Sequence, residues 1–155
     1  MLSLYLAWTT LNFEVQRGKA LEAAKQMDGG KGIINLGSTG KGDPWQMAVQ
    51  QLPQVRFNVD RQNDQPKFLY ADLEDGRLPL YDRQVSVAFA SHVLEHLSNW
   101  EGALTEWNRV ADNVVVVLPH PWSIVGRLAP DHKQFFSFGD VVEMQRRFPR
   151  TTVFM

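Results

Sequence analysis

Histidine and glutamate side chains gather at one corner of this chain, in the segment Ser91–His96 (SHVLEH). The apolar stretch Val85–Ala90 leads directly into it, so we expect a buried strand, then a polar corner, then a helix. In sheets whose strands alternate with helices, ligands bind beyond the carboxyl ends of the strands. A histidine at such a corner can line a ligand site or act as a general base near neutral pH. We therefore take His92 as a candidate catalytic residue.

Two further histidines, His120 and His132, follow a valine-rich stretch at 113–118 that we expect to be the next strand. His132 is our second candidate base, and His120 with Trp122 is expected to shape a substrate pocket. Position in a loop does not fix the direction of a side chain, so each could also face away from a ligand. His96 fits a structural role better. No spacing of His, Asp and Glu is typical of a metal site, so we predict no metal.

A glycine loop follows an apolar stretch earlier in the chain, at Ile33–Gly42 (IINLGSTGKG). Such a loop between strand and helix lets backbone N–H groups approach a ligand. Asp60 ends the next apolar stretch, 23 residues after Gly37, close to the distance of about 20 at which an acid binds a ribose. A P-loop is excluded because Gly42 replaces its Ser/Thr and Asn35 its first glycine. The pattern indicates a nucleotide-type cofactor.

The elements that must position these residues alternate along the chain. We expect helices at Phe13–Met27, Pro44–Gln51, Asn99–Val110 and Asp140–Arg147, and make no assignment for Leu2–Leu11. Strands are expected at Gly32–Leu36, Val55–Val59, Lys67–Tyr70, Val85–Ala90, Asn113–Leu118 and Thr151–Met155. This rhythm predicts an α/β fold, a doubly wound, mostly parallel, Rossmann-like sheet of about six strands. The 155 residues suffice for one domain, 1–155.

The net charge, the apolar runs and the cysteine content of the chain limit the partners and the location that we expect for it. A net charge of −1 gives no electrostatic reason to expect long nucleic acids as partners. No apolar run approaches the roughly 20 residues of a membrane span, and Met1–Trp8 lacks the basic leader of a signal peptide, so we expect a cytoplasmic protein. The chain has no cysteine, which excludes disulfides and cysteine nucleophiles.

Together these motifs resemble the class I S-adenosylmethionine-dependent methyltransferases, especially the group acting on small molecules, sugars or lipids, over residues 32–148. Asn35–Gly40 matches the family's cofactor loop, Ala71–Leu73 the segment at the adenine, and Ser91–Leu97 is the most specific match. The resemblance implies S-adenosyl-L-methionine as cofactor, with Asp60 at the ribose and Asp72 at the adenine amino group. The cofactor-binding residues that it implies are Asn35, Gly37, Ser38, Thr39, Gly40, Asp60, Arg61, Asp72, Leu73 and Ser91.

The sequence departs from the family pattern in two places. Asn35 stands where the family has an acid, and Thr39 stands where it has a glycine. The family's antiparallel seventh strand has no counterpart here. The resemblance therefore implies an open sheet edge through which a second copy could pair as a homo-oligomer.

The resemblance implies methyl transfer to a small-molecule acceptor, at a hydroxyl of a sugar- or lipid-like substrate. The corner Ala90–Val93 lacks the Asn/Asp-Pro-Pro-aromatic motif of enzymes that methylate amide or adenine nitrogens. The alternative is a catalytically inactive methyltransferase-like module that binds a partner protein. The altered loop favours that alternative, whereas Asp60 and Asp72 oppose it. An NAD(P)-binding domain fits less well, because the chain is too short to add a substrate domain.

Overall fold

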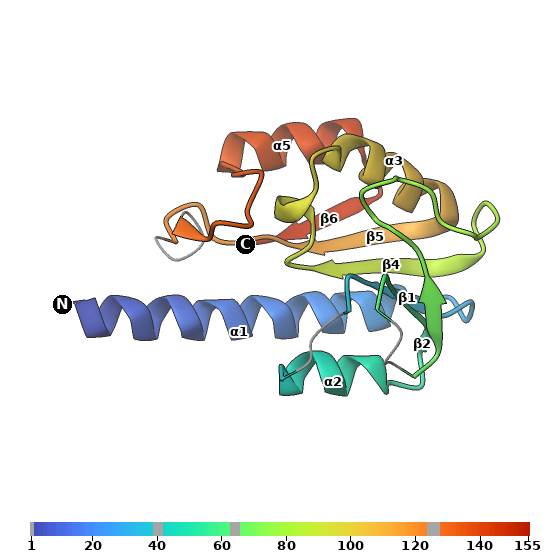
Figure 1. Ribbon diagram of the computed structural model, residues 1–155, viewed down its shortest axis with the longest axis horizontal. Coiled ribbons are helices and arrows are strands. Elements are labelled where there is room, and N and C mark those ends of the chain that lie inside the picture. The colour runs from blue at the N-terminus through green and yellow to red at the C-terminus, as the bar shows by residue number, and fades with distance from the viewer. Residues whose placement is uncertain (1, 39–41, 63–65, 124–127) are drawn as a thin grey trace.

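The computed structural model describes residues 2–38, 42–62, 66–123 and 128–155, with side chains from Thr10 onward, and shows one sheet between two layers of helices (Figure 1). The strands are β1 (Ile33–Leu36), β2 (Val55–Asp60), β3 (Phe68–Tyr70), β4 (Val85–Ser91), β5 (Ala111–Val117) and β6 (Thr151–Phe154). Their order is β3-β2-β1-β4-β5-β6, and every neighbouring pair is parallel. The predicted fold class is confirmed. β3 and β6 form the edges, and the pairing of a second copy with an edge stays a prediction.

The helices are α1 (Leu2–Met27), α2 (Pro44–Gln50), α3 (Trp100–Val110) and α5 (Phe138–Arg147), with a short 3-10 turn, η1 (Leu94–His96). In Figure 1, α1 and α2 cover one face of the sheet, and α3 and α5 cover the other. None of the helices in the described ranges has the length and apolar character that a membrane span requires.

Two expectations about helices need correction. α1 begins at Leu2 rather than Phe13, because its first residues contain no glycine or proline that would end it. The helix expected after the Ser91–His92 corner is only the turn η1. Leu97 returns to extended backbone, and the Asn99 side chain then starts a new helix by accepting a hydrogen bond from the Gly102 N–H.

Polar side chains also set where two other helices begin. The Asp43 carboxylate accepts hydrogen bonds from the first backbone N–H groups of α2, and Pro44 occupies the first helical position, where no N–H is needed. Ser137 and Asp140 form a reciprocal capping box at the start of α5. Asp43 thus fixes the end of the glycine loop, and Ser137 fixes the end of the segment that carries His132.

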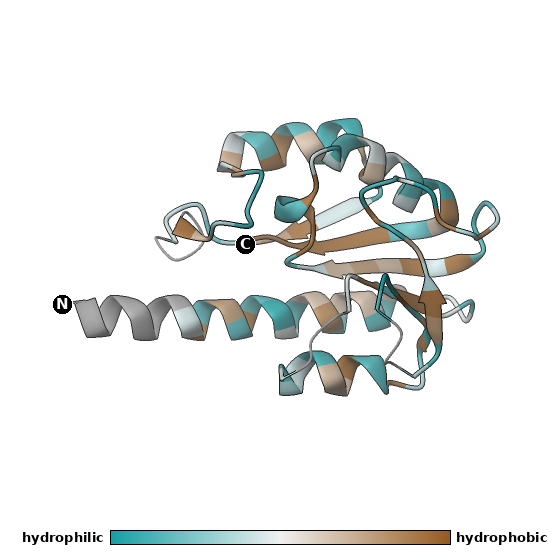
Figure 2. Ribbon diagram, in the orientation of Figure 1, coloured by the Kyte–Doolittle hydropathy of each residue, from teal (hydrophilic) through white to brown (hydrophobic). Residues whose placement is uncertain are grey.

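Alternate residues of the central strands form two separate cores. Val87 and Phe89 of β4 pack with Ala20 and Ala24 of α1, whereas Ala88 and other side chains on the opposite face pack with α3 and α5. Figure 2 shows apolar residues concentrated along β5, and polar residues along the helices and the connecting segments. β4 is buried over its whole length, so the strand that leads into the Ser91–His92 corner is fixed by core packing.

Candidate functional site

Two cavities open at the carboxyl edge of the sheet, next to the point between β1 and β4 where the strand order reverses. The first, the polar cavity, has a volume of about 500 Å³. Each of four parallel strands contributes to its wall at its carboxyl end: Gly37 after β1, Asp60 in β2, Asp72 after β3 and His92 after β4. The residues predicted at separate strand ends are thus brought together.

The second, the apolar cavity, has a volume of about 360 Å³. Its wall consists of Glu95, Pro119, His120, Pro121, Ser123, His132, Gln134, Phe135, Phe136 and Ser137. Neighbouring residues in the chain line different cavities, since His96 and Lys133 belong to the polar one and Glu95 and His132 to the apolar one. The turn η1 and the segment 131–133 therefore form a wall that the two cavities share.

Each of the two predicted cofactor aspartates is oriented by its own loop. Asp60 Oδ1 accepts hydrogen bonds from the backbone N–H groups of Arg61 (2.6 Å) and Gln62 (3.2 Å). Asp72 Oδ1 accepts one from the Glu74 N–H (3.0 Å), while its Oδ2 lies 3.5 Å from Arg61 Nη1. One oxygen of each carboxylate is thus used to fix its direction. Leu73 and Arg61 also line the polar cavity, and their role in binding the cofactor stays a prediction.

A third carboxylate in this wall, Glu74, ties the shared wall to the loop after β3. It accepts hydrogen bonds from the Ser98 backbone N–H at 3.0 and 3.1 Å and pairs with Lys133 at 3.3 Å. The hydrogen bond from Ser98 outweighs partial burial and, with the Lys133 charge, holds the pKa of Glu74 below its ordinary value. Glu74 therefore remains ionised and keeps Lys133 in place.

The glycine loop meets the Ser91–His92 corner at Gly37. Gly37 has φ +66°, and a Cβ atom there would lie 2.5 Å from Val93 Cγ2, so only glycine fits. Its N–H donates to the carbonyl of Val59 (3.0 Å). The predictions for Thr39 and Gly40 lie outside the described residues. Gly37 packs the first strand end against the fourth and closes the floor of the polar cavity.

Three predicted cofactor residues do not line the polar cavity. Asn35 is fully buried, and its Nδ2 donates to Asn58 Oδ1 of the neighbouring strand (3.0 Å). Ser38 is also buried, and its carbonyl accepts from the Gln50 side chain. Ser91 Oγ accepts from Arg17 Nε (3.3 Å). These residues hold the strands and loops together behind the cavity, through the side chains of Asn35 and Ser91 and the backbone carbonyl of Ser38.

Arg17 of α1 connects these elements, a role that the sequence did not reveal. Its guanidinium lies 4.4 Å from the Phe13 ring centre and 4.3 Å from that of Trp45, and its Nη2 is 2.7 Å from Asp43 Oδ2. Burial raises the pKa of Asp43, but the hydrogen bond and charge of Arg17 outweigh it, so the pKa lies below its ordinary value. This ion pair anchors α1 to the start of α2.

His92 faces Glu95 rather than open solvent. Its backbone is left-handed, with φ +57°, and its ring stacks at 4.5 Å on Phe13. Its Nδ1 lies 3.0 Å from Glu95 Oε1, while its Nε2 is buried and has no hydrogen-bond partner among the described residues. The ring lines the polar cavity, but its direct contact is with a carboxylate, and its catalytic role stays a prediction. His92 is therefore placed to orient Glu95.

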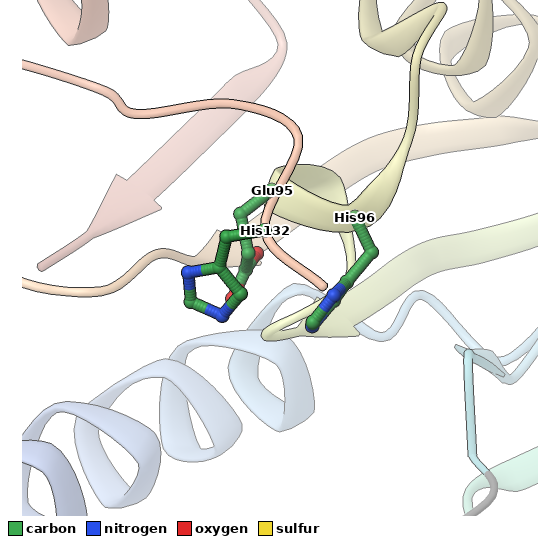
Figure 3. A group of neighbouring side chains, drawn as sticks. All are labelled: Glu95, His96 and His132. Carbon is green, nitrogen blue, oxygen red and sulfur yellow. The ribbon is translucent and has the colours of Figure 1, made fainter. Parts of the chain in front are cut away.

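A cluster that the sequence spacing did not predict lies in the shared wall: Glu95, His96 and His132 (Figure 3). One potential metal-ligating atom from each lies within 4.8 Å of the others. The rings of His96 and His132 meet edge to face, with centres 4.7 Å apart. The motif His-x-x-Glu-His supplied a signal for the first two residues. His132 comes from a distant loop, so only the fold could bring it there.

The predicted substrate residues are near the apolar cavity, in different ways. His120 lines it, whereas Trp122 is 67% exposed and does not belong to its lining. The Trp122 ring contacts His120, with ring centres 5.7 Å apart, and Phe138 at 6.5 Å. Trp122 therefore forms an aromatic rim beside His120.

Comparison with known proteins agrees with this geometry. The sequence model of the family described as "Methyltransferase domain" matches residues 43–115. A search of curated protein sequences found no match. Among solved structures, the chain is similar to an S-adenosylmethionine-dependent methyltransferase of Thermotoga maritima described as a possible histamine N-methyltransferase. That likeness has a TM-score of 0.61 at 18% identity, and covers 94% of this chain and 76% of the other.

A second similar structure is the complex between the Haloferax volcanii Trm112 methyltransferase activator and a methyltransferase, with a TM-score of 0.54 at 16% identity. The likeness covers 94% of this chain and 72% of the other. The cofactor of such enzymes fits the polar cavity, because Asp60 and Asp72 offer carboxylate oxygens at adjacent strand ends above a close-packed glycine turn. The chain therefore matches the methyltransferase-domain family over residues 43–115, and its fold is that of solved S-adenosylmethionine-dependent methyltransferases.

Proposed function

We propose that this protein transfers the methyl group of S-adenosylmethionine to a hydroxyl of a small, sugar- or lipid-like acceptor. The observation that carries the proposal is the pair of cavities with one shared wall. The first is lined by carboxylates and suits a nucleoside. The second has a mostly apolar surface, in which two prolines and two phenylalanines lie among polar residues that include Glu95 and His132. A mostly apolar pocket surface with a limited set of placed polar groups is typical of a small-molecule site.

In the polar cavity, Asp60 would accept hydrogen bonds from the ribose hydroxyls and Asp72 from the adenine amino group. Arg61 would close the rim beside them, since its Nη1 already lies 3.5 Å from Asp72 Oδ2. When bound, the cofactor supplies an electrophilic methyl group on a sulfonium, so the enzyme contributes mainly positioning and exclusion of water.

In the apolar cavity, Pro119, Phe135 and Phe136 would hold the carbon skeleton of the acceptor. As the acceptor oxygen bonds to the methyl carbon, the carbon–sulfur bond breaks with its electron pair going to sulfur, and the hydroxyl must release its proton. The shared wall faces that oxygen. We infer that Glu95, His96 and His132 activate the hydroxyl, with His132 retained as the candidate base because its side chain lines this cavity.

The test is a transfer assay with isotope-labelled methyl donor and a panel of small alcohols, sugars and hydroxylated lipids. We expect the label to appear on an oxygen, and His132→Ala to lower the rate at least 100-fold without changing the affinity for S-adenosylhomocysteine. Histamine is included in the panel as a nitrogen acceptor, because the similar Thermotoga maritima structure is described as a possible histamine N-methyltransferase. Transfer only to nitrogen would contradict the hydroxyl assignment.

A further inference from the structure

We propose that Glu95, His96 and His132 bind a divalent transition-metal ion, of which Zn²⁺ is the best fit. Two imidazoles and one carboxylate make the ligand set of many catalytic zinc sites, and imidazole ligands disfavour Mg²⁺ and Ca²⁺. The three side chains meet in the shared wall, with the ligating atoms within 4.8 Å of one another (Figure 3). The site stands on these residues alone, whereas its role in methyl transfer rests on the proposed function.

Glu95 supplies the strongest sign that something is bound here. Its side chain is only 1% exposed, yet Oε2 has no hydrogen-bond partner among the described residues. A buried carboxylate oxygen without a partner is costly, so such groups are normally paired or coordinated to a metal. The other oxygen, Oε1, is held at 3.0 Å by His92 Nδ1. One oxygen is thus oriented by a neighbour, and the other is left for an ion.

His96 is oriented in the way that metal-ligating histidines usually are. Its Nδ1 lies 3.1 Å from the Asp131 backbone carbonyl and 3.4 Å from the Asp131 carboxylate. In metal sites, the second ring nitrogen of a histidine ligand donates to a carbonyl or a carboxylate, which fixes the ring. With Nδ1 directed at Asp131, Nε2 remains available as the ligand.

The loop that carries His132 is fastened to the same glutamate. The backbone N–H groups of Lys133 and Gln134 both donate to the Glu95 carbonyl, at 2.8 and 3.0 Å. The third ligand therefore stays beside the first two, although it is distant in sequence. Zinc–ligand distances of about 2.0–2.2 Å would require the three atoms to approach by roughly 1 Å, which side-chain rotation can supply.

A metal in this wall would have free coordination positions, because the described part of the chain supplies three ligands. Glu95 and His132 line the apolar cavity, so an oxygen atom of the acceptor could occupy a free position. Coordination lowers the pKa of a bound hydroxyl and fixes its place. In the metal-bound enzyme His132 would then act as a ligand, and activation of the hydroxyl would pass to the ion.

The test uses the full chain without an affinity tag, freed of metal by a chelator and titrated with Zn²⁺ by calorimetry and with Co²⁺ by visible absorption. We expect one ion per chain. His96→Ala and His132→Ala should each weaken binding at least 100-fold, and His92→Ala about 10- to 100-fold through loss of orientation of Glu95. Glu95→Gln preserves shape and removes the charge, and should also weaken binding.

His120→Ala is the matched control, because His120 is not one of the three clustered ligating residues and is not the histidine that orients Glu95, so metal binding should be unchanged. Circular dichroism verifies that each variant is folded. Absence of one-to-one metal binding in the folded protein would overturn the site. So would metal affinities of the His96→Ala and His132→Ala variants equal to that of the unsubstituted protein. S-adenosylhomocysteine is titrated separately into metal-free protein. Metal binding without binding of that nucleoside would refute the proposed function and leave the metal site standing.

Discussion

At the scale of single residues, the site depends on carboxylates that are directed by their own loops. Asp60 uses one oxygen to bind the N–H groups of Arg61 and Gln62, and Asp72 uses one to bind that of Glu74. A hydrogen bond to a charged group contributes about 1.5–3 kcal/mol, and leaving a buried partner unsatisfied costs a similar amount. The other oxygen of Asp60 remains available to a ribose, so its replacement should lower the affinity for the nucleoside.

Asp60→Asn tests this assignment with little change in shape. The asparagine Oδ1 can still accept from Arg61 and Gln62, but its Nδ2 can no longer accept from ribose hydroxyls. We expect S-adenosylhomocysteine to bind about 10- to 100-fold more weakly by calorimetry, with little change in stability. Asp112→Asn is the control, because Asp112 pairs with Lys31 and Arg83 at the amino edge of the sheet. Equal affinity of the two variants would refute the role of Asp60.

The sequence allowed Asp60, Asp72 and His92 to be placed because each comes at a predicted strand end, and parallel strands share one edge. The sequence could not show where the Asn35 side chain points, because its position in the family motif does not identify its hydrogen-bond partner. In the folded chain Asn35 donates a hydrogen bond to Asn58, 23 residues away. His132 could not be joined to Glu95 from sequence, since the contact depends on backbone bonds of the intervening loop.

At the scale of elements, α1 is the least expected part of the molecule. It packs on β4 and β5 through small residues, Ala20 and Ala24, and carries Arg17 to the start of α2. The periodicity predicted a helix ending at Met27, which is correct. It could not predict the contacts of Arg17, because an arginine in a helical sequence is normally expected at the surface. Its aromatic and acidic partners are identified only in the folded chain.

Arg17→Met tests whether α1 is anchored by this ion pair. The change removes the hydrogen bonds to Ser91 and Asp43 and the contacts with two aromatic rings. We expect the free energy of unfolding in urea to fall by about 2–3 kcal/mol.

Lys25→Met on the same helix provides the comparison, since its pair with Glu22 is exposed and should change stability by no more than about 0.5 kcal/mol. If the Arg17 variant unfolds at the same urea concentration as the Lys25 variant, Arg17 does not anchor the helix.

At the scale of the whole molecule, a parallel sheet brings four strand ends to one edge and divides the space above them into a polar and an apolar cavity. Alternating apolar segments were enough to predict the sheet and its class. The shared wall was not predictable, because it needs β4 beside β1 and the segment 131–133 folded back on η1. Our central claim is that the polar cavity receives the nucleoside of S-adenosylmethionine.

The most direct measurement is calorimetric titration of the purified protein with S-adenosylhomocysteine, with NAD as the control nucleotide. We predict micromolar, one-to-one binding of the former and no binding of the latter, because Asp60 and Asp72 lie in one polar cavity where they can bind one ribose and one adenine. Absence of S-adenosylhomocysteine binding in folded protein would contradict the account. It would favour the alternative of a methyltransferase-like module that binds a partner protein.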